Sequence, residues 1–337
     1  CMINSTFSIN MRFIRLLLFF IFITINRISA QNYIPADPFN LLEFEKESYL
    51  DSISESSFMI RPLIINHKTF ISLSIRSESF YNNNVPNLEN IGNRFIGKGF
   101  GSFSTIKISY NGKFVYLSIE PFYQSSQNKE FNIEGRDELF SRLNDNKSSF
   151  SSFGLRETQF YLHYKGVGFG YSNANMWWGP GFHNSLTMTN NTTGFPHFML
   201  GTIREKRFKK LGFNFRYIFS KLDKTIGDPY FTALIGNLTY HANPKISLGF
   251  SRNYLSGGLP KDRPFTSWDA ALIVFEQLLV DTKIKEYPTY WDAHDPWDQL
   301  ISVFILVDFP LSKLKLYSEI GTNDHRQNFS DLRAHPD

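Results

Sequence analysis

Residues 173–191, NANMWWGPGFHNSLTMTNN, place two adjacent tryptophans before a Gly-Pro-Gly turn and follow them with amides and hydroxyls. Flat indole rings can cover the apolar face of a sugar ring while amide and hydroxyl groups bond its hydroxyls. We therefore predict a carbohydrate contact here, with Trp177 or Trp178 as the stacking platform. The expected hydrogen-bonding side chains are those of His183, Asn184, Asn190 and Asn191. The alternative is a structural role for the rings in an aromatic belt at a membrane interface.

A second group of polar and aromatic residues lies in YWDAHDPWDQL, residues 290–300. Two carboxylates beside aromatic sugar platforms would suit a glycosidase. The sequence does not fix the separation of these carboxylates, however, and Asp-Pro ahead of a strand is ordinary turn chemistry. A loop cap is therefore favoured over a sugar or ion contact, and catalysis is the least favoured interpretation. The residues concerned are Asp292, His294, Asp295 and Asp298, with Trp291 and Trp297.

The remaining motifs indicate no cofactor. The eight histidines are scattered without a ligand spacing such as H-E-x-x-H, so no metal site is expected. The glycine-rich stretch GNRFIGKGFG leads into a strand and lacks Gly-Lys-Ser/Thr, which favours a flexible link over a phosphate loop. The basic run REKRFKK, residues 204–210, is interpreted as a solvated turn, with contact to acidic glycan or phosphate groups as the alternative.

Length and composition set the broad class. The chain has 337 residues, of which 42% are apolar, and this suffices for a sizeable core. A formal net charge of +4 is too small to argue for nucleic acid as a partner. The aromatic fraction of 17% is high, but an A- and T-rich coding sequence also favours Phe and Tyr, so positions carry more weight than numbers. The single cysteine, Cys1, excludes an internal disulfide framework.

The N-terminal region predicts export. From Met11, the stretch MRFIRLLLFFIFITINRISAQ has two arginines, an apolar run and a small residue at Ala30. This is the plan of a cleaved secretory signal over residues 11–30, and its apolar run is too short to span a bilayer as a helix. Residues 1–10 then lie upstream of the protein, and residues 31–337 form its folded domain. No later segment is apolar for long enough to form a membrane helix.

Hydrophobic alternation with a period of two recurs along this domain. Around Asn111-Gly112, a strong signal for a two-residue hairpin, the predicted apolar partners are Ile108 with Val115 and Ile106 with Leu117. The polar face of the same hairpin pairs Thr105 with Ser118 and Lys107 with Tyr116. Both strands therefore agree on which face is apolar.

A second hairpin is predicted at Lys165-Gly166. It pairs Tyr164 with Val167, Leu162 with Phe169 and Phe160 with Tyr171. The opposite face carries polar residues or glycines, namely Gln159, His163, Gly168, Gly170 and Ser172. Further strands with the same alternation are expected at LGFNFRYIFS, KISLGFSRN and KLKLYSEI.

Such alternation suits either a soluble sandwich or a membrane barrel with a hydrated interior, and the connections decide between them. Short turns are predicted near 111–112, 165–166, 204–210, 242–244 and 310–313. Longer connections fall between them, at 123–156, 174–196, 220–230 and 255–298. This order is typical of outer-membrane barrels, which have tight periplasmic turns and large external loops. We therefore predict an all-β fold, an antiparallel transmembrane β-barrel of about a dozen strands.

Two features complicate a simple barrel. The chain ends in DLRAHPD, which is polar and unlike a strand, so the barrel is expected to be truncated, with C-terminal strands missing. Short helical segments are predicted within the long connections, near 135–145 and 266–285. Each could plug the barrel mouth or pack on its own loop.

Two stretches resemble the capsule assembly proteins of the Wzi type. They are MWWGPGFHNSLTMTNNTTGFPHFMLGT at 176–202 and DQLISVFILVDFPLSKLKLYSEIGTNDHRQNF at 298–329, and the similarity runs from about residue 33 onward. The resemblance implies a closed outer-membrane barrel plugged by helical elements, with a lectin-like role in holding capsular polysaccharide. Carried to this sequence, the role falls on Trp177, Trp178, Gly179, Pro180 and the amides at 190 and 191. The chain departs from the family by ending before several further strands.

The functional hypothesis is a non-enzymatic outer-membrane barrel that binds exported polysaccharide and tethers it. Its expected partners are capsular or other surface polysaccharide and outer-membrane lipid, with no nucleic acid, no cofactor and a monomeric barrel. A porin-like channel for small polar solutes is the first alternative. A glycan hydrolase built on residues 290–300 is the second.

Overall fold

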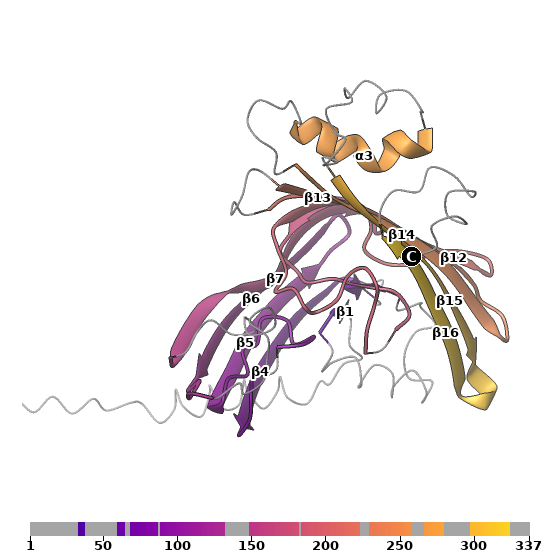
Figure 1. Ribbon diagram of the computed structural model, residues 1–337. Coiled ribbons are helices and arrows are strands. Elements are labelled where there is room, and N and C mark those ends of the chain that lie inside the picture. The colour runs from indigo at the N-terminus through magenta and orange to yellow at the C-terminus, as the bar shows by residue number, and fades with distance from the viewer. Residues whose placement is uncertain are drawn as a thin grey trace, which may run out of the picture. The chain divides into compact units, whose positions relative to one another are not determined.

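The computed structural model describes residues 33–37, 59–64, 68–86, 88–131, 148–181, 183–222, 229–257, 266–279 and 297–323. Within these ranges one antiparallel sheet of twelve strands dominates, and its strands follow one another in chain order. Figure 1 shows this sheet as a strongly curved wall, with β4 in indigo at one edge and β16 in yellow at the other. The strands are β4(Phe70–Asn82), β5(Gly99–Asn111), β6(Val115–Ser126), β7(Phe150–Tyr164), β8(Val167–Ser172), β10(His197–Thr202), β11(Lys206–Phe208), β12(Leu211–Lys221), β13(Pro229–Tyr240), β14(Lys245–Gly257), β15(Trp297–Phe309) and β16(Leu314–Asn323).

The two faces of this wall are inverted relative to a soluble protein. On β12, Leu211, Phe213 and Phe215 are exposed, whereas Asn214 and Arg216 are buried. The other long strands likewise expose Ile, Leu, Phe and Tyr on one face and bury polar side chains on the other. An apolar face open to the surroundings is the pattern of a lipid-facing barrel wall. The predicted all-β, antiparallel transmembrane barrel fold is confirmed.

The connections alternate as predicted. At one end of the wall the strands are joined by residues 112–114, 165–166, 203–210, 241–244 and 310–313. At the other end the connections are 83–98, 127–149, 173–196, 222–228 and 258–296, and all but 222–228 are longer than any in the first set. We call the second end the loop end of the wall, which in a membrane barrel is the external one.

The hairpin at Lys165-Gly166 has the predicted register. Tyr164 pairs with Val167, and the pairing continues to Phe160 with Tyr171. Lys165 and Gly166 have φ angles of 52° and 85°. A type I′ turn requires positive φ at both central residues, so the local sequence alone sets this register.

The register predicted at Asn111-Gly112 is wrong. Asn111 pairs with Tyr116, and Ile108 pairs with Ile119 rather than with Val115. The buried Asn111 donates from Nδ2 to the Lys68 carbonyl oxygen at 2.9 Å, which holds it in β5 and lengthens the turn. Because the shift is even, both strands keep the predicted faces, with Ser118 still buried.

The helix predicted at 266–285 is present as α3(Ser267–Leu279). Thr266 and Asp269 cap it reciprocally: each backbone N–H donates to the other's side-chain oxygen, at 2.8 and 3.2 Å. No helix among the described residues is long and apolar enough to cross a membrane. The helix predicted near 135–145 lies outside the described residues.

Helix α3 packs on the outward face of the wall, above β13 and β14 (Figure 1). Thr232 donates to the Ala270 carbonyl oxygen at 2.6 Å, and Tyr254 packs against Ile273 and Val274. Thr232 and Tyr254 are register partners, and Thr232 is also the partner of the outward Phe219. This helix therefore does not plug the interior, which is a correction to one of the two roles considered for it.

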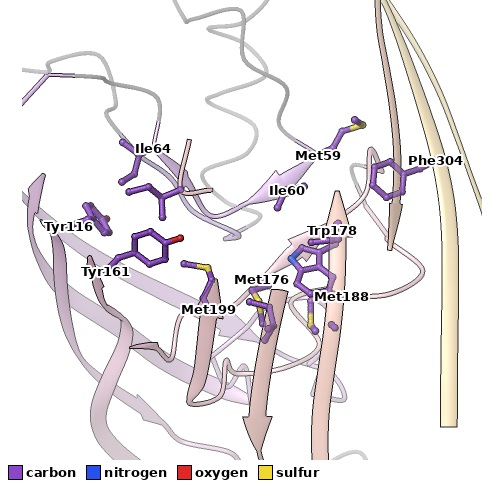
Figure 2. Close-up of a cluster of buried hydrophobic side chains, with 14 residues drawn as sticks. Met59, Ile60, Ile64, Tyr116, Tyr161, Met176, Trp178, Met188, Met199 and Phe304 are labelled. Carbon is purple, nitrogen blue, oxygen red and sulfur yellow. The ribbon is translucent and has the colours of Figure 1, made fainter. Parts of the chain in front are cut away.

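Short strands from distant parts of the chain fill the inner side of the wall. Strand β1(Tyr33–Ile34) pairs with β3(Leu63–Ile64), and β2(Ile60–Arg61) pairs with β9(Trp177–Trp178). Figure 2 shows their side chains meeting inward residues of the wall. The cluster contains Met59, Ile60, Ile64, Met176, Trp178 and Met188 from these segments and Tyr116, Tyr161, Met199, Ile203, Ile218, Ala233, Ile235 and Phe304 from the wall and its turns. We call residues 33–37, 59–64 and 173–194 the insert. The uniformly hydrated interior expected from alternation is thus corrected to an apolar core around the insert.

Glycines on β8 allow the wall to pack tightly against Tyr161. The Tyr161 hydroxyl lies 2.6 Å from the carbonyl oxygens of Gly168 and Gly201. A Cβ added at Gly168 would lie 1.9 Å from the Leu162 carbonyl oxygen, so the backbone would have to move.

We expect Gly168→Ala to destabilise the β7–β8 hairpin by about 1–3 kcal/mol, the usual effect of overpacking. Urea unfolding of the refolded protein in detergent measures this change. Gly236→Ala is the matched control, because its added Cβ would lie 3.4 Å from the nearest atom. Equal unfolding midpoints for the two variants would contradict the prediction.

Candidate functional site

The two tryptophans of the segment after β8 are buried. Trp177 is 1% exposed and Trp178 is 0% exposed. Strand β2 pairs with both residues and covers them, and Trp178 belongs to the apolar core of the insert. Trp177 donates from Nε1 to the Gly181 carbonyl oxygen at 3.1 Å, and the Arg61 guanidinium carbon lies 5.0 Å from the centre of the Trp177 ring. The open stacking platform expected from the sequence is therefore corrected: these rings hold the segment in place.

Asn190 is also an internal anchor. It is 2% exposed and donates from Nδ2 to the Ala36 carbonyl oxygen at 2.6 Å. Its Oδ1 accepts a hydrogen bond of 2.7 Å from Asn175, which in turn bonds Thr192. The amide that the sequence predicted as a sugar contact thus joins two parts of the insert.

The other predicted residues, His183, Asn184 and Asn191, are exposed, and together with the half-buried Asn90 they form a polar group that we call the loop cluster. Asn90, from the connection 83–98, donates from Nδ2 to the His183 carbonyl oxygen at 3.0 Å. Its backbone N–H donates to Asn191 Oδ1 at 2.8 Å. Asn90 therefore brings His183 and Asn191 together, and sequence reasoning missed it because it lies about a hundred residues away. Among the described residues, Asn90 Oδ1 is a buried acceptor without a hydrogen-bond donor.

A buried ion cluster fixes the start of the insert to the wall. Asp37 Oδ2 lies 2.9 Å from Arg76 Nη1, 3.0 Å from Arg94 Nη2 and 3.1 Å from Arg156 Nη2. Burial by itself raises the pKa of the Asp37 carboxyl, but Arg94, Arg156 and Arg76 together outweigh this and hold that pKa well below its usual range. The carboxylate stays charged, and three guanidinium groups depend on it.

Further carboxylates balance the same arginines. Glu78 lies 2.5 Å from Arg94, and Glu120 lies 3.3 Å from Arg156. The cluster is thus a network and not a single pair, and it spans β4, β6 and β7. No motif identified it: of these residues only Glu120 lies in a strand predicted from the sequence, and Arg156 lies in the predicted connection 123–156.

The remaining sequence predictions have mixed outcomes. Asp292, His294 and Asp295 lie outside the described residues, and Asp298 is exposed at the start of β15. The basic run 204–210 connects β10 to β12 as a short turn, as predicted, but it is not solvated throughout: residues 206–208 form β11, and Glu205 is buried with Oε1 2.8 Å from His241 Nε2. No group of three or more His, Cys, Asp or Glu side chains within the described ranges could hold a metal ion.

A lipid-facing antiparallel wall with a folded insert on its inner side defines a membrane β-barrel whose interior is occupied by part of its own chain. More specifically, the chain belongs to the capsule assembly protein Wzi family, whose model matches residues 85–334. The resemblance noted in the sequence is therefore confirmed. Comparison with curated proteins found no match.

A solved structure shares the fold. It is Wzi of Escherichia coli, described as an outer-membrane protein involved in group 1 capsule assembly and a carbohydrate-binding β-barrel. The two structures align with a TM-score of 0.53 at 12% sequence identity. The alignment covers 88% of this chain and 65% of the other, so this chain spans less than two thirds of that protein's length.

Proposed function

We propose that this protein is a non-enzymatic outer-membrane barrel that binds exported capsular polysaccharide and helps to anchor it at the cell surface. Family membership supports a role in capsule assembly. The observation that carries the proposal is the loop cluster, an exposed polar surface built by two loop-end connections and fixed to a packed insert. On this proposal the protein is exported through the leader at 11–30 and acts as a monomeric barrel in contact with outer-membrane lipid.

The loop cluster offers the groups that a sugar requires. Each amide supplies two N–H donors and one acceptor oxygen, and a histidine ring supplies one of each when neutral. A sugar hydroxyl both donates and accepts, so adjacent amides can bond neighbouring hydroxyls. Asn90 holds the exposed His183 and Asn191 side by side through its Nδ2 and backbone N–H donors. Trp177 and Trp178 then contribute by holding the segment, and Asn190 by tying it to the insert.

The filled interior favours this role over the porin-like alternative. A channel for small polar solutes needs an open, hydrated lumen. Here Met, Ile and Trp side chains of the insert pack directly on the inner face of the wall. A rigid insert suits a binding surface, because groups held by packing lose little conformational freedom on binding.

The proposal predicts that His183→Ala, Asn184→Ala and Asn191→Ala in one chain weaken polysaccharide binding at least about tenfold. Each lost hydrogen bond contributes about 0.5–1.5 kcal/mol, and about 1.4 kcal/mol corresponds to a tenfold change in affinity. Binding of purified capsular polysaccharide to the detergent-solubilised protein measures the effect, with cell-surface capsule retention as a second readout. Heated and unheated electrophoretic mobility checks that the barrel still folds.

Lys209→Ala with Lys210→Ala is the matched control, since these exposed residues lie in the turn 203–210 at the opposite end of the wall. It should bind like the unmodified protein. Unchanged binding by the triple variant would refute the loop cluster as the polysaccharide site.

A further inference from the structure

A row of serines crosses the outward face of four consecutive strands. Ser79, Ser102, Ser125 and Ser151 are register partners on β4, β5, β6 and β7. The Oγ atoms of Ser102 and Ser125 are 2.9 Å apart. Every second side chain of a strand points to the same face. Ser79 shares a face with the exposed Ile75 on β4, and Ser102 shares a face with the exposed Ile106 on β5, so this row is on the lipid-facing side.

The serine row lines a recess of about 620 Å³. The remaining lining residues are Phe100, Gly101, Ser126, Gln127, Ser149 and Phe150. Phe100 is 63% exposed, with its ring centre 4.7 Å from that of Tyr81. On the other side of the row, Tyr123 and Phe153 are register partners and are also exposed. Along the strands, the serine hydroxyl groups therefore have aromatic rings on both sides.

The position of the serine row along the strands sets its level in the membrane. Ser125 and Ser151 lie one residue from the loop-end limits of β6 and β7. Hydroxyls in hydrocarbon without strong partners are costly, whereas they are readily satisfied among headgroups. The recess thus lies where the apolar face of the wall gives way to the headgroups of the external leaflet.

The side chain of Lys129 passes close to that of Gln127, one of the residues that line this recess. A Cβ added at Gly99 would lie 3.1 Å from Gln127 Cβ and 3.4 Å from Lys129 Cδ, so the stem of Lys129 runs next to Gln127. Lys129 is exposed and connected by its backbone N–H to the Lys98 carbonyl oxygen at 2.8 Å. An ammonium group at this point can pair with a phosphate.

We propose that this recess binds the phosphorylated sugar headgroup of a glycolipid in the external leaflet. The serines would bond the sugar hydroxyls, Phe100 would cover a ring face, and Lys129 would meet the phosphate. The ligand is a lipid of the surrounding membrane, since the serine row and Phe100 lie on the lipid-facing side of the wall. The site is separate from the loop cluster and does not depend on the function proposed above.

The test fills the recess with leucine side chains in one double variant, Ser102→Leu with Ser125→Leu. Each variant is reconstituted in nanodiscs that contain phospholipid and purified rough-type lipopolysaccharide, and the lipopolysaccharide retained after detergent exchange is quantified by mass spectrometry. We expect retention to fall about fivefold or more. Ser318→Leu is the matched control, because Ser318 is an exposed, outward-facing serine on β16 and should leave retention unchanged.

Ser79→Ala with Ser151→Ala provides a milder variant that adds no bulk, and it should lower retention in the same direction. Unchanged retention in both double variants would overturn the proposal, as would an equal loss in Ser318→Leu. Binding of soluble capsular polysaccharide is measured in parallel. A loss of polysaccharide binding with lipopolysaccharide retained would also overturn it, because the recess would then serve the polysaccharide.

Discussion

Replacement of Asp37 by asparagine is expected to release the N-terminal part of the insert from the wall. Asparagine is nearly isosteric, but it removes the negative charge that three arginines share within 3.1 Å. Removing one partner of a buried charge network costs up to about 3–5 kcal/mol, because three guanidinium groups lose a shared partner and only Glu78 and Glu120 remain to balance them. Hydrogen–deuterium exchange should show faster exchange in residues 33–37 and 59–64 than in the unmodified protein.

The same cluster has a defined dependence on pH. The arginines lower the pKa of folded Asp37, so the cluster contributes its full stability above the ordinary aspartate pKa of about 3.9. That contribution is lost as the pH falls below this value toward the pKa of the folded state. Exchange in residues 33–37, corrected for intrinsic rates, should therefore stay constant from about pH 7 to pH 5 and increase below about pH 4. In Asp37→Asn, the part of this increase in exchange at low pH that comes from protonation of Asp37 should be absent.

A matched control for Asp37 is available on the wall itself. Asp308 is also buried, but within the described part of the chain it pairs with one cation, Lys245, at 3.2 Å. Asp308→Asn should therefore have a smaller effect and should leave exchange in residues 33–37 unchanged. If Asp37→Asn preserved the protection of those residues, the ion cluster would not be what holds the insert.

Replacement of Trp178 by alanine is the second change with a large expected effect. Trp178 is fully buried, belongs to the same apolar cluster as Met59, Met176 and Met188 (Figure 2), and pairs through its backbone with Ile60. Truncation of a buried tryptophan costs about 3–5 kcal/mol, because it removes transfer free energy and leaves a cavity. We expect urea to unfold the insert at a lower concentration and polysaccharide binding to weaken as a consequence.

Two measurements separate this packing role from direct stacking on sugar. Trp178→Phe keeps much of the buried volume and should retain more of the stability than Trp178→Ala. Exposed Trp268 on α3, at 69% exposure, supplies the control, since Trp268→Ala should change stability by less than about 0.5 kcal/mol. Equal effects of the two alanine variants on stability would contradict the burial of Trp178 as the reason for its importance.

The features that were predictable from sequence are those set by near neighbours. Strand alternation, the turn at Lys165-Gly166 and the capped start of α3 each depend on residues within a few positions of one another. The register at Asn111 was not predictable, because a contact with the Lys68 carbonyl decides it. The faces were nevertheless right, since they follow from the period of two alone.

The site depends on contacts that no local pattern contains. The burial of the rings at 177 and 178 depends on residues distant in sequence, because β2 at 60–61 pairs with these residues and Arg61 lies over the Trp177 ring. Asp37 meets Arg156 across 119 positions of sequence. Residue type correctly marked the segment 173–191 as unusual, but only the tertiary structure distinguishes its exposed amides from its buried anchors.

The hydrogen bond from Asn190 to the Ala36 carbonyl has a mechanical consequence. Ala36 is the immediate neighbour of Asp37, so tension applied to a polymer held at the loop cluster would run through Asn190 to the arginines of β4 and β7. The pull would be spread over several strands, and no single flexible loop would stretch. If the protein anchors polysaccharide as proposed, this arrangement would help it to resist shear without a covalent bond to the polymer.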